Sequence, residues 1–208
     1  MTRLILERVQ VRHGRSTLVD EVSATVGEDH GPGAGELFGL IGPNGAGKSS
    51  LLRCLAGLLP WRTGSLQWCG ATLPPQDPAY QRQLAYMGHQ AGMSDTLTGM
   101  ENLRFALDLM AVSWNEARVQ AVLQALSLTG VVARPFGRLS QGQRRRLGLS
   151  RVLLGERPLW LLDEPTEGLD AATAADVLAR FLRRCGLKGH APAAPNAGGL
   201  TRLRSDLV

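Results

Sequence analysis

A glycine-rich segment that ends in lysine and serine is the clearest chemical signal in this sequence. Residues 42–49 are GPNGAGKS, which matches the pattern GxxxxGK[ST] in full. Glycines let consecutive main-chain N–H groups turn toward one side and cradle an anion, and a helix that follows directs its positive end to the same place. The ammonium of Lys48 can reach the β- and γ-phosphates of a nucleotide, and the Ser49 hydroxyl can ligate Mg²⁺.

These residues predict a phosphate-binding loop with a nucleotide as its ligand. The alternative is a glycine-rich turn that only reverses the chain. Lys48 argues against that alternative, because the chain has only one other lysine, Lys188. The residues expected to surround the phosphates are Gly42, Pro43, Asn44, Gly45, Ala46, Gly47, Lys48, Ser49 and Ser50.

Two adjacent acids, Asp163 and Glu164, follow directly on the apolar run LWLL at 159–162. Open α/β sheets bind their ligands at the carboxyl ends of the strands. Asp163 can hold Mg²⁺ through water there, and Glu164 can polarise an attacking water. The acids could instead stabilise the start of a helix. Because a phosphate loop is also predicted, metal and water chemistry is the favoured interpretation.

The elements that must position these residues follow from the hydrophobic pattern. Strands are predicted where residues alternate with period two or form short apolar runs, at 4–12, 18–26, 37–41, 65–69, 84–88 and 159–162. Helices are predicted directly after the phosphate loop, near 99–111, near 114–127, from about 140 to 155, and over 171–184. Capping boxes formed by Thr98 with Glu101 and by Ser113 with Glu116 mark the second and third starts.

This order of elements predicts an α/β domain over residues 1–185 with a helical subdomain at roughly 91–140. Residues 186–208 are rich in proline, glycine and small side chains, and they are predicted to be a disordered tail.

Composition excludes several broad classes of protein. With 44% apolar and 20% charged residues among 208, the chain has ordinary globular usage. Its net charge of +5 suits an acidic membrane surface or nucleic acid without requiring either. Three cysteines without a CxxC pair argue against a disulfide scaffold and a zinc site. No apolar run reaches the roughly 18 residues of a membrane-spanning helix, so a membrane role is expected to come through a partner.

Three consecutive arginines, Arg144, Arg145 and Arg146, allow two interpretations. They could contact nucleic acid, or they could form the solvated face of a helix. The solvated face is favoured, because no aromatic residues interleave with them and the net charge is modest. No nucleic-acid partner is expected.

The segment 139–143, LSQGQ, resembles the LSGGQ signature of ATP-binding cassette (ABC) ATPases, with Gln141 in place of the first glycine. Gln90 stands at the position of the family's Q-loop, and Gly168-Leu169-Asp170 resembles its D-loop. The resemblance extends over residues 3 to about 184. It implies an α/β fold, namely a P-loop NTPase of the ABC ATPase type. Such a fold has a mixed sheet core, an inserted helical subdomain and an antiparallel β N-terminal part.

The resemblance also implies a head-to-tail dimer that hydrolyses ATP with Mg²⁺. In this family the phosphate loop of one subunit faces the signature of the other, with the nucleotide between them. By resemblance, the catalytic residues are Glu164, Gln90 and Lys48, the metal ligands are Ser49, Gln90 and Asp163, and the further nucleotide contacts are Ser140, Gly142, Gln143 and Asp170. From its local chemistry alone, Ser140 could equally cap its helix without any ligand.

Two further stretches, MGHQ at 87–90 and ENLRF at 101–105, resemble the ATPase subunits of ABC transporters for c-type cytochrome biogenesis. This implies a homodimer docked to two copies of an integral membrane subunit, peripheral at the cytoplasmic face of a bacterial inner membrane. Its task would be haem export or the release of a haem-loaded chaperone. The alternatives are the ATPase subunit of another ABC exporter, or a nucleotide-binding subunit with impaired hydrolysis. For His89, a polar loop residue is favoured over a haem ligand.

The carboxyl-terminal part departs from the family pattern. The family normally has another buried strand after the helix at 171–184, ending in a histidine that senses the γ-phosphate. Here His190 comes early in a proline- and glycine-rich stretch, and Asn196 lies nearer the expected place without an apolar strand before it. We therefore expect the switch histidine to be absent. The family's adenine-stacking aromatic is also replaced, and His13 or a neighbouring arginine could stack on the base more weakly.

Overall fold

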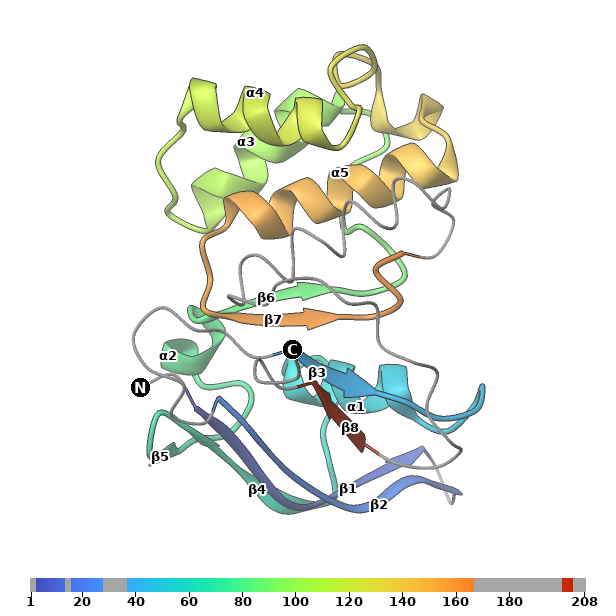
Figure 1. Ribbon diagram of the computed structural model, residues 1–208, viewed down its shortest axis with the longest axis vertical. Coiled ribbons are helices and arrows are strands. Elements are labelled where there is room, and N and C mark those ends of the chain that lie inside the picture. Colours follow the sequence, from blue (N-terminus) through green and yellow to red (C-terminus); the bar gives the residue numbers. More distant parts are fainter. Residues whose placement is uncertain (1–2, 14–15, 28–36, 167–199, 204–208) are drawn as a thin grey trace. The chain divides into compact units, whose positions relative to one another are not determined.

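The computed structural model describes residues 3–13, 16–27, 37–166 and 200–203 (Figure 1). These residues fall into two compact units. The first holds the described residues up to Gln81 together with 200–203, and the second begins at Arg82. Within the described ranges, no helix has the length and apolar character needed to cross a membrane.

An antiparallel sheet forms the N-terminal part of the first unit, as the family resemblance implies. Its strands, in spatial order, are β2 (Ser16–Val26), β1 (Leu4–His13), β4 (Thr63–Trp68) and β5 (Ala71–Thr72). The sheet confirms the strands predicted at 4–12, 18–26 and 65–69. Figure 1 shows β1 and β2 as two long strands.

A bulge in β1 keeps its apolar residues on one face. Leu4 and Leu6 are buried, and so are Val9 and Val11, although the two pairs are out of phase with a strict alternation. The register against β2 shifts between Leu6 and Val9, where Arg8 has a φ of 49°. An extra residue in one strand re-phases the side chains that follow it, so both pairs reach the core.

The phosphate-loop segment lies between β3 (Leu37–Leu40) and α1 (Lys48–Leu55), as predicted. α1 buries one face, on which Leu51, Leu52, Cys54 and Leu55 lie. Burial raises the pKa of the Cys54 thiol, which suits an unreactive core residue. The short helix α2 (Pro78–Gln81) follows the sheet.

The strand β8 (Leu200–Leu203) pairs antiparallel with β3. It lies inside the segment 186–208, for which the sequence predicts disorder. That prediction is therefore wrong for these 4 residues, because the main-chain groups of β3 supply the partners that the tail lacks locally. The rest of the predicted tail, the predicted helix at 171–184, and the segment 28–36 lie outside the described residues.

The second unit is built on two parallel strands covered by helices. β6 (Leu84–Met87) pairs with β7 (Leu159–Leu162), from Leu84 opposite Leu159 to Met87 opposite Leu162. Helix α5 (Gln141–Leu154) packs along β6, and both α3 (Gly99–Leu109) and α4 (Glu116–Ala125) pack against α5 (Figure 1). The 3₁₀ helix η1 (Phe136–Arg138) precedes α5. The three helices expected in this region are confirmed.

The predicted capping box of α3 is confirmed, but that of α4 is wrong. Thr98 Oγ1 accepts a hydrogen bond from the N–H of Glu101 at 3.1 Å, and the Glu101 carboxylate accepts from the N–H of Thr98 at 2.7 Å. For α4, Asn115 is the N-cap, and its Oδ1 accepts from the N–H of Arg118 at 3.0 Å. Asn115 directly precedes the first helical residue and caps as well as serine does, whereas Ser113 lies two positions too early.

Replacing Asn115 with alanine should lower the free energy of unfolding by about 1 kcal/mol, because an orphan N–H of α4 loses its acceptor. Ser113→Ala, the matched control, should change it by no more than about 0.5 kcal/mol. Urea unfolding of both variants and the unchanged chain, followed by circular dichroism, measures the difference. An equal or larger loss in Ser113→Ala would contradict the assigned cap.

Candidate functional site

The segment 42–49 curves around the ammonium of Lys48. Nζ of Lys48 donates to the carbonyl oxygens of Gly42 at 2.7 Å and Pro43 at 2.9 Å. The N–H of Ala46 donates to the carbonyl of Pro43 at 3.2 Å and closes the turn. An ammonium has three N–H donors, so the same lysine can hold the loop and donate to a phosphate oxygen.

Two glycines give this loop its shape. Gly45 and Gly47 have φ values of 83° and 87°, which side chains disfavour. At Gly47 a Cβ would also lie 2.7 Å from the carbonyl oxygen of Leu18 in β2. Gly47 is therefore required twice, once by its backbone conformation and once by its close approach to the sheet.

The amino-terminal end of α1 fits an anion. Its N-cap, Gly47, has no side chain to accept from the first N–H groups, and the first turn of α1 contains no acidic residue. Ser49 and Ser50 are half-buried in that turn, whereas Pro43, Asn44, Gly45 and Ala46 are exposed. Exposed main-chain donors at the positive end of a helix suit the phosphates of a nucleotide.

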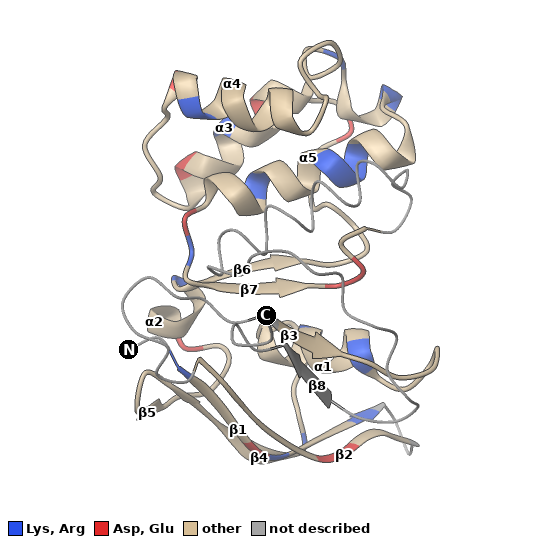
Figure 2. Ribbon diagram, in the orientation of Figure 1, with Lys and Arg blue, Asp and Glu red and all other residues tan. Residues whose placement is uncertain are grey.

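In the second unit, the ends of β6 and β7 bring two predicted site segments to one edge. Gln90 follows β6 after two residues, and Asp163 and Glu164 directly follow β7. The N–H of Asp163 donates to the carbonyl of Met87 at 2.8 Å, which extends the β6–β7 pairing by one residue. Figure 2 shows the acidic pair at the end of β7. Carboxylate and amide oxygens are ligands that suit Mg²⁺.

Glu164 lies in an uncommon backbone conformation. Its φ is 49°, in the left-handed region that side chains seldom occupy. Such a conformation costs about 1–3 kcal/mol and persists only where the surroundings hold it. The side chain of Asp163 is buried, with 7% of the residue exposed, whereas Glu164 and Gln90 are exposed. The strand end therefore buries one acid and presents the other to solvent.

Arg145 of α5 is a residue of this edge that the sequence analysis missed. It is only 7% exposed, so the solvated-face interpretation of the three arginines is wrong for this one. Its Nη1 donates to the carbonyls of Gly88 at 2.7 Å and His89 at 3.3 Å, and its Nη2 donates to the carbonyls of Asp163 and Glu164.

A signal for this burial was present in the sequence. Leu149 and Val152, four and seven residues after Arg145, are both buried, and residues at this spacing share one face of a helix. Arg145 thus lies on the apolar face of α5, while Arg144 and Arg146 on either side are half-buried.

The signature segment forms the start of α5. Ser140 is its N-cap: Ser140 Oγ accepts from the N–H of Gln143 at 3.3 Å, and Gln143 Oε1 accepts from the N–H of Ser140 at 2.9 Å. The capping role that local chemistry allowed for Ser140 is therefore present. The first turn of α5, which includes the half-buried Gly142, contains no acidic residue. A hydroxyl that accepts a hydrogen bond can still donate its own proton, so capping leaves Ser140 able to contact a phosphate.

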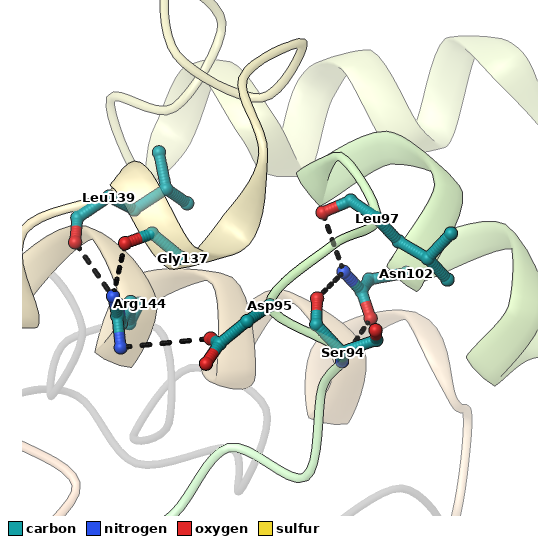
Figure 3. Close-up of polar contacts among 7 residues, drawn as sticks. All are labelled: Ser94, Asp95, Leu97, Asn102, Gly137, Leu139 and Arg144. Atoms are coloured by element: carbon teal, nitrogen blue, oxygen red, sulfur yellow. Dashed lines mark hydrogen bonds and ion pairs between the residues drawn. The ribbon is translucent and has the colours of Figure 1, made fainter.

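The loop that leads into the signature is held by Arg144 (Figure 3). Arg144 Nε donates to the carbonyl of Leu139 at 3.0 Å, and its Nη2 donates to that of Gly137 at 2.6 Å. Its Nη1 lies 3.8 Å from the Asp95 carboxylate. These contacts tie the signature helix to the segment that follows Gln90.

The same segment is anchored to α3 by Asn102, which is 4% exposed. Asn102 Oδ1 accepts from the N–H of Ser94 at 2.8 Å, and its Nδ2 donates to the carbonyls of Ser94 at 3.0 Å and Leu97 at 3.3 Å (Figure 3). A buried amide with both ends hydrogen-bonded specifies one conformation of the loop.

An apolar pocket of about 480 Å³ lies among β6, α3 and α5. Phe105 and Leu109 of α3 line it and are 59% and 73% exposed. Arg151 Nη2 donates to the carbonyl of Tyr86 in the pocket wall at 3.0 Å, and burial lowers the pKa of Arg151. Large exposed apolar side chains around a hollow are typical of a protein interaction site.

Several of the remaining predicted residues lie outside the described part of the chain. Gly168-Leu169-Asp170, His190 and Asn196 are outside the described residues. His13 is the last residue of β1, and the hairpin tip beyond it is also outside. His89 is an exposed loop residue. The phosphate loop belongs to the first unit, whereas Gln90, the signature and the acidic pair belong to the second.

Similarity to solved structures identifies the fold. An ABC transporter ATP-binding protein from Pyrococcus furiosus superposes with a TM-score of 0.72 at 20% identity, covering 88% of this chain and 86% of that one. The ATP-binding cassette MJ0796, a dimer bound to ADP and Pi, gives a TM-score of 0.74 at 22% identity, covering 86% and 82%. The chain therefore has the ABC ATPase fold that its motifs predict.

Similarity to curated sequences points to a narrower group of proteins than similarity of fold does. The cytochrome c biogenesis ATP-binding export protein CcmA of Bordetella bronchiseptica is 48% identical over 139 residues, which cover 67% of this chain and 62% of that protein. The protein of the same name from Cupriavidus pinatubonensis is 44% identical over 164 residues, covering 77% and 73%. This chain thus spans less than two thirds of the length of the two Bordetella relatives, at 62% of each.

A family model also matches, since residues 32–167 fit the one described as ABC transporter. Together with the phosphate loop, the acidic pair and the signature helix, these similarities show that the chain belongs to the ABC transporter family, in which cytochrome c biogenesis ATP-binding export proteins are its relatives.

Proposed function

We propose that this chain binds ATP with Mg²⁺ and hydrolyses it, as a head-to-tail dimer, to drive an ABC transporter of c-type cytochrome biogenesis. The observation that carries the proposal is the loop 42–49 curled around Lys48 at the start of α1. The names of the relatives favour this assignment over another ABC exporter.

In the proposed complex, the phosphates lie against the main-chain N–H groups of 44–47 and the first turn of α1. Lys48 neutralises charge on the β- and γ-phosphates, and Ser49 and Ser50 donate from the helix start. Asp163, Gln90 and Ser49 would hold Mg²⁺, which when bound neutralises phosphate charge. A second copy of the chain contributes Ser140, Gly142, Gln143 and Asp170 to the other side of the nucleotide.

Hydrolysis then depends on Glu164. Its carboxylate orients a water molecule and accepts a proton from it, while the water oxygen bonds to the γ-phosphorus. The bond from that phosphorus to the oxygen bridging to the β-phosphate breaks, which yields ADP and inorganic phosphate. Lys48 and the main-chain donors stabilise the charge that builds up on the phosphate oxygens.

The proposed partner is a pair of integral membrane subunits at the cytoplasmic face of a bacterial inner membrane. The apolar pocket beside Phe105 and Leu109 suits a helical segment of such a subunit. Haem, or a haem-loaded chaperone, is the proposed cargo. An impaired hydrolysis, caused by a missing switch histidine, stays a prediction, because His190 and Asn196 lie outside the described residues.

Lys48→Ala should weaken ATP binding roughly 10- to 150-fold, because a charged hydrogen-bonding group contributes about 1.5–3 kcal/mol. Lys188→Ala, which removes the only other lysine, is the matched control and should bind as the unchanged chain does. Isothermal titration calorimetry with ATP and Mg²⁺ gives both affinities. No binding by the unchanged chain, or equal effects of the two substitutions, would overturn the proposed site.

Glu164→Gln should retain ATP binding and lose hydrolysis by on the order of 100-fold or more, because the amide cannot accept the proton of the attacking water. The ATP-bound dimer should then accumulate, and light scattering during size exclusion detects it. The same variant with ADP serves as the control and should stay monomeric. A variant that remains monomeric with saturating ATP would refute the sandwich dimer for this chain.

Leu109→Arg should reduce co-purification with the membrane subunit about tenfold or more, because a charge in an apolar contact is left without a partner. Leu58→Arg is the matched control, since Leu58 is 61% exposed but belongs to the other unit. Binding of ATP should be unchanged in both variants. Similar losses for the two would argue against docking at this pocket.

A further inference from the structure

Arg145 connects the two loops that carry Gln90 and the acidic pair. Its guanidinium lies in the second turn of α5 and donates to four main-chain carbonyls, two after β6 and two after β7. A guanidinium is a planar fork of five N–H donors, so one side chain can reach both loops at once. An ammonium is a point charge and cannot span both pairs of acceptors in this way.

The acceptors are main-chain atoms, so Arg145 fixes the position of the backbone from which the functional side chains extend. It binds the carbonyls of Gly88 and His89, the two residues that precede Gln90, and those of Asp163 and Glu164 themselves. Glu164 has a φ of 49°, and its carbonyl is one of the groups that the guanidinium holds. A strained residue keeps its conformation only while such contacts persist.

We propose that Arg145 is a positioning residue of the ATPase site. It holds the Gln90 loop and the Asp163–Glu164 turn in fixed positions relative to each other. The inference rests on the proposed ATP hydrolysis and names a residue that acts on its hydrolytic step. The phosphate loop belongs to the other unit and uses Lys48, so it determines the affinity for ATP. Arg145 instead affects the turnover rate and its dependence on Mg²⁺.

The test compares Arg145→Lys and Arg145→Gln with the control Arg118→Gln. Arg118 of α4 is also an arginine of the second unit that donates to a main-chain carbonyl, that of Leu153 in the last turn of α5 at 3.0 Å. We expect kcat to fall at least tenfold in both Arg145 variants, with ATP affinity within threefold of the unchanged chain. The Mg²⁺ concentration for half-maximal activity should rise at least threefold. Arg118→Gln should match the unchanged chain in all three quantities.

These readouts separate positioning from loss of folded protein, which lowers the apparent kcat but leaves the half-saturating Mg²⁺ concentration unchanged. A kcat within twofold of the unchanged chain, or a lower kcat with unchanged Mg²⁺ dependence, would overturn the proposal. If Arg145→Gln does not fold, Arg145→Lys carries the test. If that variant does not fold either, Arg145 is needed for folding itself and the positioning role is refuted.

Amide hydrogen exchange tests the inference without ATP turnover. In Arg145→Lys, the amides of residues 88–90 and 163–164 should exchange at least tenfold faster, while residues 99–109 of α3 keep their rate. Unchanged exchange in the first two segments would overturn the inference. Should the unchanged chain neither bind nor hydrolyse ATP, the proposed function fails, and the exchange experiment still decides whether Arg145 holds these loops.

Discussion

Parallel pairing of β6 and β7 is the constraint on which the second unit depends. Parallel strands end at the same edge of a sheet, so the residues that follow each strand are brought together whatever lies between them in sequence. The register of Met87 opposite Leu162, followed by the hydrogen bond from Asp163 to Met87, carries this order one residue past β7. Gln90, Asp163 and Glu164 share an edge for that reason.

Helix α5 contributes both the signature segment and the arginines that bind the neighbouring loops and β6. Its first turn contains the signature segment, capped by Ser140 and Gln143. Arg145, which is buried, donates to carbonyls after β6, and Arg151, which is half-buried, donates to a carbonyl in β6. Arg144 binds the loop before the helix. Arg144 and Arg145 thus donate to main-chain acceptors in loops, and buried carbonyls need such partners.

The phosphate loop depends on a different kind of constraint, which is almost entirely local. Gly45 and Gly47 adopt positive φ values, and Lys48 donates back to carbonyls five and six residues earlier. The close approach of Gly47 to Leu18 comes from another part of the chain. A motif whose geometry is made by its own residues can be identified from sequence alone, and this one was.

Features whose partners lie far apart in the sequence needed the tertiary structure, whereas local ones did not. The capping box of Thr98 and Glu101 was predicted correctly, because both partners lie within one turn. At α4, the sequence predicted Ser113 as the cap, but the structure begins the helix after Asn115, two residues later. The strand β8 was missed, because its pairing partner, β3, lies more than a hundred residues earlier in the chain.

By itself, the sequence determined the family, the phosphate loop, the acidic pair at a strand end and the approximate helices, since each depends on residues close together in the chain. Only the tertiary structure decided that the guanidinium of Arg145 binds main-chain carbonyls at the ends of two strands. The physical reason is that the rotation of α5 about its axis is set by packing against β6, α3 and α4, and not by the residues of the helix alone.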